Sequence, residues 1–306
     1  MERAFFPLGS KPHLINAPWN PQTAIDEADR LLKGEIKYFS HQFIQTSFPP
    51  IWHHDYVTDS NLDPYKHWSQ IPHDSSADIK FIWEPNRFAF VYTLVRAYVS
   101  SQDEKYPEAF WTLVEDWAKH NPPNTGPNWM DGQEIALRLM AWTFGYRHFV
   151  DSPSSTPERI EQFTLYIAAQ ADRIYKNIGY AISTRSNHTI SEAFGLWVVG
   201  LLFPELNHGE KYLSLGKRIL EEEAANQILH DGSYSMYSLN YHRFILHIYL
   251  YAIRIGDINH IPLSTELKRS VANSITCLSR LIDPQTGEMP VYGSNDGALV
   301  LPLNNC

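Results

Sequence analysis

What this 306-residue sequence lacks excludes several classes of protein. It has two cysteines, Cys277 and Cys306, too few for a disulfide framework. No run of 18 apolar residues could form a membrane span. Its 14 histidines include no H-E-x-x-H motif, and no C-x-x-C occurs, so no metal site is expected. The net charge of −9 provides no overall basic field that would gather nucleic acid.

Apolar and aromatic side chains, in contrast, are plentiful. Hydrophobic residues make up 43% of the chain and aromatic ones 13%, enough for a sizeable core in one large domain or two smaller ones. Aromatic rings pack cores well and also stack on the apolar faces of sugars. Residues 1–9 lack the basic and long apolar regions of a signal peptide, so this N-terminus assigns no compartment.

Helical periodicity dominates the chain after residue 84. The first 80 residues contain several prolines and are expected to be mostly irregular, with one helix at about 23–33. Further helices are expected at roughly 84–101, 105–119, 131–149, 156–178, 188–203, 209–229, 239–256 and 264–282. Antiparallel helix pairs in series favour an all-α solenoid or closed toroid, and the absence of a fixed-length repeat disfavours an ordinary repeat array.

The last residues change in character. A turn cluster at 283–287 precedes a stretch rich in glycine and proline. This composition predicts a helical domain over 1–283 and, over 284–306, a linker leading into a β domain that the sequence has no room to include.

The segment 186–192 precedes an apolar helical stripe at 190, 194, 197 and 201. Thr189 and Glu192 fit a capping box, which would place Asn187 and His188 at the mouth of the helix. Helix N-termini favour carboxylates, Asn187 can donate a hydrogen bond without adding charge, and the dipole should favour neutral His188. The alternative is an asparagine cap beside a surface histidine.

A second segment, 231–243, delivers Tyr241, His242 and Arg243 into the first turn of a helix. A tyrosine can abstract the proton of a carbon acid when a nearby cation or donor lowers its pKa from about 10. Arg243 or His188 could do so. The alternative is that Tyr241 merely continues the apolar stripe at 245, 248 and 252 as a core residue.

Two further segments carry paired charges. Glu134 and Arg138 lie four apart on one helix face, and Arg138 held at the rim of a cleft, with Trp129 as a sugar platform, would bind substrate. The alternative is a solvated surface pair. Glu84 and Arg87 lie three apart where Pro85 predicts a helix start, and their alternative is a structural ion pair.

Taken in order, segments 78–87, 128–138, 187–204 and 231–243 resemble the heparinase II/III-like lyases, relatives of alginate lyases with an (α/α) toroid. Residues 290–303 resemble the segment where that family passes into its β-sandwich. The resemblance implies an all-α fold, an incomplete toroid over 1–283, and a start of the β-sandwich against which it would pack. It also implies a polysaccharide lyase that cleaves a uronate-containing glycan by β-elimination without a cofactor.

The resemblance also implies roles for individual residues. Asn187 and His188 would neutralise the uronate carboxylate and so acidify the C5 proton, and Tyr241 would take that proton, return one to O4, or both. The expected substrate-binding residues are Arg138, Glu134, Trp129, Asn128, Arg243, His242, Arg87 and Glu84.

Two departures from the family and two other functions stay open. Many relatives have Glu where this chain has Met236, and the family also uses a histidine from its β-sandwich, so this stretch alone could bind without turnover. Relatives are often periplasmic.

A toroid glycoside hydrolase would need two opposed carboxylic residues, for which Glu84, Asp131, Glu134 and Glu192 are candidates. A non-catalytic glycan-binding domain would use Trp52, Trp129 and the arginines and make Tyr241 dispensable.

Overall fold

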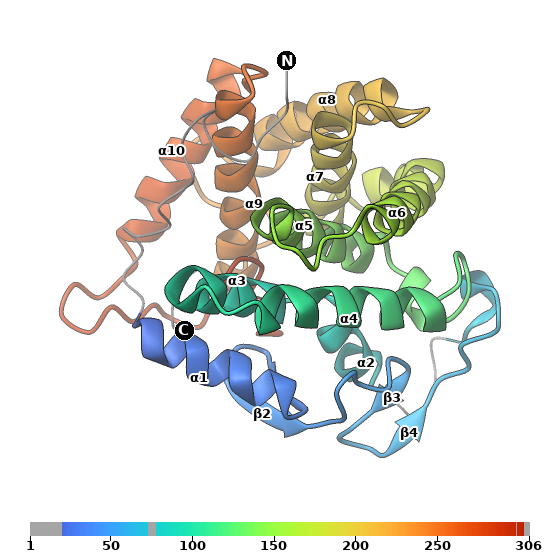
Figure 1. The fold of residues 1–306 in the computed structure, drawn as a ribbon. Helices are drawn as coiled ribbons and strands as arrows, with labels where there is room; N and C mark the ends of the chain where they lie inside the picture. Colours follow the sequence, from blue (N-terminus) through green and yellow to red (C-terminus); the bar gives the residue numbers. More distant parts are fainter. Residues whose placement is uncertain (1–19, 73–77, 298, 303–306) are drawn as a thin grey trace. The chain divides into compact units, whose positions relative to one another are not determined.

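The computed structural model describes residues 20–72, 78–297 and 299–302 (Figure 1). They form two compact units. The first unit comprises the described residues up to Arg173, with 301 and 302, and the second runs from Ile174 to Val300. Each unit is described by itself. No helix in the described part of the chain combines the length and apolar character needed to cross a bilayer.

The first unit is helical with two small hairpins. Its elements are α1 (Pro21–Leu32), β1 (Glu35–Tyr38), β2 (Gln42–Gln45), β3 (His54–Asp55), β4 (Ser60–Asn61), η2 (Trp68–Gln70), α2 (Ile79–Asn86), α3 (Phe90–Ser101), α4 (Lys105–His120), η3 (Pro127–Trp129), α5 (Gly132–Phe149) and the first part of α6 (Pro157–Thr184). β1 pairs with β2 and β3 with β4, both antiparallel. The stretch expected to be mostly irregular therefore contains, besides the expected helix, two short sheets.

The helix expected at 84–101 is two helices. Asp78 begins α2 by accepting a hydrogen bond from the Lys80 N–H. Pro85 lies near the end of α2, so the prediction that it marks a helix start was wrong. Phe88, with a left-handed φ of 59°, lies between α2 and α3. A residue in the left-handed conformation cannot continue a right-handed helix, so the chain turns at Phe88 and a new helix begins after it.

Aromatic side chains fill the core of the first unit. Trp117, Trp129 and Trp142 have no exposed surface. Trp142 stacks on Phe163 with ring centroids 5.6 Å apart, and Trp117 meets Trp142 edge-on. Both arrangements are favourable for aromatic quadrupoles. Much of the aromatic content therefore serves packing rather than sugar binding.

The second unit continues α6 and adds four helices. They are α7 (Asn187–Leu202), α8 (Gly209–Gln227), α9 (Leu239–Ile258) and α10 (Thr265–Ser279). α7 is buried along almost its whole length, so the expected single stripe was too narrow a description. α7 and α8 approach closely at Gly200, where an added Cβ would lie 2.3 Å from the Leu213 nitrogen. Glycine is therefore required at that position.

The residues after α10, read from the sequence as a linker, fold back onto the start of α9. The Leu239 N–H donates to the Tyr292 carbonyl (3.1 Å). Ser238 Oγ donates to the Ser294 carbonyl at 2.6 Å. This stretch is therefore part of the second unit as far as Val300.

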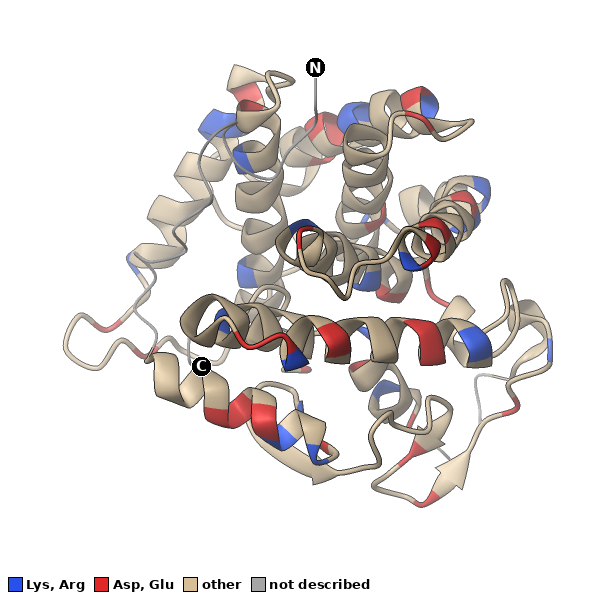
Figure 2. Ribbon diagram, in the orientation of Figure 1, with Lys and Arg blue, Asp and Glu red and all other residues tan. Residues whose placement is uncertain are grey.

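Charges of both signs are interspersed along the helices. Figure 2 shows acidic and basic positions scattered over a ribbon that is mostly uncharged, without a uniformly basic region. This distribution agrees with the net charge of −9 and leaves recognition of an acidic ligand to local groups.

Candidate active site

The first candidate segment lies at the start of α7. Ser186 caps the helix, because its Oγ accepts a hydrogen bond from the His188 N–H (3.3 Å). The expected capping box was wrong, since the Thr189 hydroxyl instead donates to the Ala181 carbonyl at 2.6 Å. Asn187 is the first residue of the helix, so Asn187 and His188 do lie at its mouth. The positive end of the helix dipole acts on both.

The two side chains at this helix start differ in exposure. Asn187 is 3% exposed, whereas His188 is half-buried. The alternative of an asparagine cap beside a surface histidine is therefore not found, because the cap is Ser186. His188 presents more surface to solvent than Asn187 does.

A buried amide links the start of α7 to the chain entering α9. The Gln227 side chain, at the end of α8, donates to the Ser186 carbonyl (3.1 Å) and accepts from the Tyr234 hydroxyl (2.9 Å). Burial raises the pKa of Tyr234, which keeps this phenol protonated as a donor. Tyr234 lies only five residues before α9 begins at Leu239. The two helix starts therefore lie at the same end of the second unit.

Tyr241 lies in the first turn of α9, where Ser238 caps the helix by accepting from the Tyr241 N–H (3.1 Å). Its side chain is half-buried, unlike the core residues that continue the stripe along the helix. The hydroxyl donates to Asp296 Oδ2 at 3.0 Å, and Asn240 Nδ2 donates to Asp296 Oδ1 at 3.0 Å. Arg243 Nη2 in turn donates to Asn240 Oδ1 at 3.0 Å.

Asp296 is a residue of this site that sequence reasoning missed. It lies in the Gly293–Gly297 stretch, which was noted only as a resemblance to the entry of a second domain. A carboxylate flanked by Asn295 and Gly297 is typical of a turn, so the local sequence has no signal that pairs it with Tyr241. Its partner is 55 positions away.

His242 faces away from the site. It is 2% exposed, its ring packs against Tyr234, and its Nε2 is 2.5 Å from Ser274 Oγ on α10. Burial lowers the pKa of His242, so the ring is neutral near pH 7. The expected substrate contact of His242 was therefore wrong, and the residue supports the packing of α9 on α10.

A cavity of about 520 Å³ adjoins the start of α9. Asn240 and Arg243 line it together with Pro290, Tyr292 and Asn295. Its volume is in the range of small-molecule sites, and it combines an apolar lining with a few polar groups, as such sites do. Arg243 is the cationic side chain of this lining.

In the first unit, Arg87 joins two carboxylates. Its guanidinium donates to Glu84 at 2.6 Å and to both oxygens of Glu134 at 2.6 and 2.8 Å. The ion pair of Glu134 is therefore with Arg87, directly after α2, where the sequence had suggested Arg138. Glu84 also accepts from the Phe39 N–H (2.9 Å). The group is largely buried, with 14% of the Arg87 side chain exposed.

Arg138, Asn128 and Trp129 are completely buried. Arg138 donates to Gln170 (2.7 Å) and to the carbonyls of Asn86 (3.1 Å) and Asn128 (2.9 Å). Its guanidinium also lies over the Trp117 ring, 4.2 Å from the centroid. The predictions that Arg138 lies at the rim of a cleft and that Trp129 forms a sugar platform were therefore wrong, because all three residues belong to the core.

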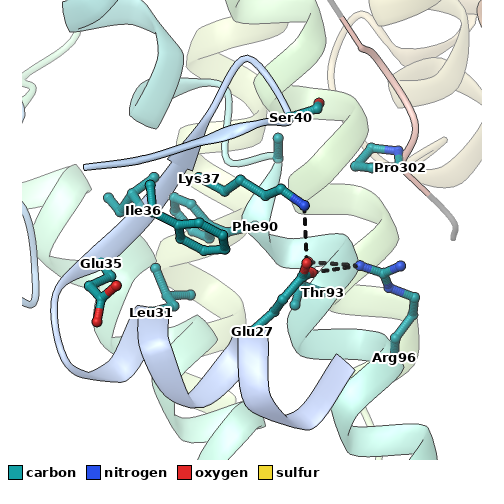
Figure 3. Close-up of a pocket in the computed structure, with 12 residues that line it drawn as sticks. Glu27, Leu31, Glu35, Ile36, Lys37, Ser40, Phe90, Thr93, Arg96 and Pro302 are labelled. Atoms are coloured by element: carbon teal, nitrogen blue, oxygen red, sulfur yellow. Dashed lines mark hydrogen bonds and ion pairs between the residues drawn. The ribbon is translucent and has the colours of Figure 1, made fainter. Parts of the chain in front are cut away.

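A pocket in the first unit lies between α1, β1 and α3 (Figure 3). The Glu27 carboxylate lies 3.0 Å from Lys37 Nζ and 3.5 Å from Arg96 Nη2, so both cations have an acidic neighbour. The pocket volume of about 50 Å³ is well below that of ordinary ligand sites. Across the described ranges, no three His, Cys, Asp or Glu side chains gather as they would around a metal ion.

The family follows from comparison with known proteins. The model described as Heparinase II/III N-terminus matches residues 16–297. The chain belongs to the heparinase II/III family. It is 30% identical over 248 residues to a heparin-sulfate lyase of Bacteroides thetaiotaomicron, covering 78% of the chain and 33% of that lyase. The chain thus spans about a third of the length of the curated family members it matches.

Solved structures show the same fold. The crystal structure of heparinase III has a TM-score of 0.64 and 24% identity, over 90% of this chain and 40% of that one. Alginate lyase A1-III from Sphingomonas species A1 has a TM-score of 0.51 and 12% identity, over 88% and 82%. The expected all-α fold of the (α/α) toroid type is confirmed, as is the family resemblance.

Proposed function

We propose that this chain is the helical part of a polysaccharide lyase that cleaves a uronate-containing glycan by β-elimination. Two curated relatives are named heparin-sulfate lyases, and a protein of the same fold is an alginate lyase. Heparan sulfate and alginate both contain uronic acids, and that shared chemistry defines the proposed substrate class.

The reaction needs three functions from the protein. A group must neutralise the uronate carboxylate so that the C5 proton becomes acidic, and we assign this to Asn187 and His188 at the positive end of α7. A base must take the C5 proton, and an acid must protonate the O4 atom as it leaves. Tyr241 serves as one or both of these. The products carry a C4=C5 double bond, and no water is consumed.

The observation that carries the proposal is that α7 and α9 begin at the same end of the second unit. Gln227 connects Ser186, which caps α7, to Tyr234 just before α9. This brings the segment of Asn187 and His188 and the segment of Tyr241 to one end of the second unit. Arg243, which lines the cavity beside α9, is proposed to hold an acidic group of the glycan.

On the first unit, the proposed substrate residues are Arg87, Glu84 and Glu134. The paired carboxylates fix the Arg87 guanidinium, whose side chain keeps 14% of its surface exposed. An acidic sugar would meet a guanidinium of fixed orientation. Asn128, Trp129 and Arg138 act through the core beneath it.

The test is a lyase assay of the protein that carries this chain, on heparan sulfate, chondroitin, hyaluronan and alginate. Near-ultraviolet absorbance should grow with at least one polymer as unsaturated ends form. Tyr241→Phe should lower kcat by about a hundredfold or more while binding is retained. Tyr237→Phe is the matched control, because Tyr237 is 67% exposed on the approach to α9 and should leave kcat unchanged.

Three outcomes would contradict the proposal. Reducing ends released without absorbance would mean hydrolysis. Full turnover by Tyr241→Phe would remove the phenol from the chemistry. Binding of a uronate polymer without turnover by the complete protein would make this a glycan-binding domain.

A further inference from the structure

The Asp296 carboxylate is bonded to two side chains from the first turn of α9. Its Oδ2 accepts the Tyr241 hydroxyl and its Oδ1 accepts the Asn240 amide, both at 3.0 Å. Asn240 is itself held by Arg243. A carboxylate is only an acceptor when ionised, so the phenolic proton must point toward it.

The segment that carries Asp296 is itself attached to α9. The carbonyls of Tyr292 and Ser294 accept hydrogen bonds from Leu239 N–H and Ser238 Oγ. At Gly293, an added Cβ would lie 2.1 Å from the Tyr237 carbonyl, so the two backbones are in close contact. This attachment holds the carboxylate beside the phenol.

We propose that Asp296 is a positioning residue, whose carboxylate orients the Tyr241 hydroxyl and keeps the proton on it, so that Tyr241 is the acid that protonates the departing O4. The inference rests on the proposed lyase function and narrows it. A carboxylate beside a phenolate would repel it, so the Asp296 charge favours the neutral phenol. An acid, unlike a base, must begin the reaction protonated.

The elimination needs one group besides Tyr241, a base that takes the C5 proton. The electron pair of the C5–H bond becomes the C4=C5 double bond, and the C4–O4 pair leaves with O4. Tyr241 gives its proton to O4, and the C5 proton passes to the imidazole of His188. In this narrower mechanism His188 is the base, and Asn187 is left to neutralise the carboxylate. Tyr241 is then a phenolate and His188 an imidazolium, and proton exchange with solvent restores both.

Other titratable groups at this end of the second unit come from several elements. Tyr234, before α9, is close enough that Tyr241 contributes to raising its pKa, and Glu223 of α8 does the same. Arg243 acts through Asn240. His188 lies at the start of α7. Among these groups, Asp296 is the carboxylate that accepts the Tyr241 hydroxyl directly.

The pairing is tested first without any substrate. The Tyr241 ring is followed by NMR of tyrosine labelled at the ring carbon bearing oxygen, assigned by its absence in Tyr241→Phe. In Asp296→Asn, loss of the negative charge should move the Tyr241 titration midpoint about one to two pH units lower. Asp283→Asn, which removes the same charge from an exposed turn, should leave it unchanged. An unmoved or higher midpoint in Asp296→Asn overturns the proposal.

The acid role is tested by the pH profile of turnover. Asp296→Asn should move the alkaline limb of kcat to lower pH by about the same one to two units, with kcat at the optimum about tenfold lower and KM little changed. A purely structural role would lower kcat equally at every pH. If the acidic limb moves to lower pH instead, Tyr241 is the base and the acid role is wrong. Absence of turnover in the unmutated protein would defeat the lyase function, while the titration would still decide the pairing.

Discussion

The two units each contain a polar cluster, and the clusters differ in burial. In the first unit, Arg138 is fully buried, and its guanidinium bonds to Gln170 and to two backbone carbonyls. In the second unit, Tyr241 is half-buried, and its hydroxyl reaches Asp296 near an open cavity. Both are charge-assisted networks.

The difference separates groups that hold the fold from groups that meet a ligand. A cation with no exposed surface cannot reach a substrate, and its loss leaves the core acceptors that it bonds without partners. A phenol at the surface of a unit can exchange its partner for a ligand at small cost to folding. Four substitutions test this difference, and the one with the largest expected effect comes first.

Arg138→Met should lower the free energy of unfolding by about 3–5 kcal/mol, because the Asn86 and Asn128 carbonyls lose a buried donor. Urea unfolding followed by tryptophan fluorescence measures the change. Arg269→Met removes an exposed arginine and should change stability by less than about 0.5 kcal/mol. Equal losses of stability in the two variants would contradict the claim that the buried Arg138 guanidinium stabilises the fold.

His188→Ala should lower kcat/KM by about a hundredfold and leave the unfolding midpoint nearly unchanged, since the side chain is half-buried at a helix start. Initial rates on the polymer cleaved by the unmutated protein provide the measurement. His230→Ala alters an exposed histidine in the same unit and should retain full activity. Loss of stability matching the loss of activity would assign His188 to the fold instead.

Gly200→Ala should destabilise the protein by about 2 kcal/mol, because the new Cβ would press on the backbone of α8. Gly179→Ala, in α6 with nothing within 4 Å of its Cβ, should stabilise by about 0.5–1 kcal/mol through helix propensity. Thermal unfolding of the pair compares the same chemical change in crowded and open surroundings. Stabilisation by both changes would show that α7 and α8 are less closely packed in solution.

Burial also predicts a pH dependence in the first unit. His53 is bonded to Asn121, and burial lowers its pKa to about 4. The unfolded chain takes up this proton near pH 6.5, so His53 contributes stability above that pH and loses it as the pH falls toward 4. His53→Gln keeps a donor but does not titrate, so it should lose about 1 kcal/mol less between pH 8 and 5.5. Exposed His41→Gln is the control, and parallel stability curves for His53→Gln and the unmutated protein would contradict the assignment.

Sequence reasoning succeeded where the signal was local. From α4 to α10, every expected helix is present, because periodic apolar residues and capping residues act over a few positions. The position of Asn187 at a helix mouth was predicted correctly although the capping residue was not. The division between α2 and α3 was missed because it depends on one left-handed residue, Phe88, whose type does not predict it.

Errors in the site came from partners distant in sequence. Glu134 and Arg138 have ideal helical spacing, yet Glu134 pairs with Arg87, 47 positions away. Trp129 is of a residue type that often stacks on sugars, yet it is fully buried. Spacing along a helix reports which residues share a face, but not whether that face is covered.

By itself the sequence determined the helices from α4 to α10, the family and the two segments that begin α7 and α9, because caps and periodicity are encoded within one or two turns. The tertiary structure decided which polar groups are buried and which carboxylate accepts the Tyr241 hydroxyl. The physical reason is that burial and charge pairing depend on residues brought together by the whole fold. Asp296 and Tyr241, 55 positions apart, meet only because the segment after α10 returns to the start of α9.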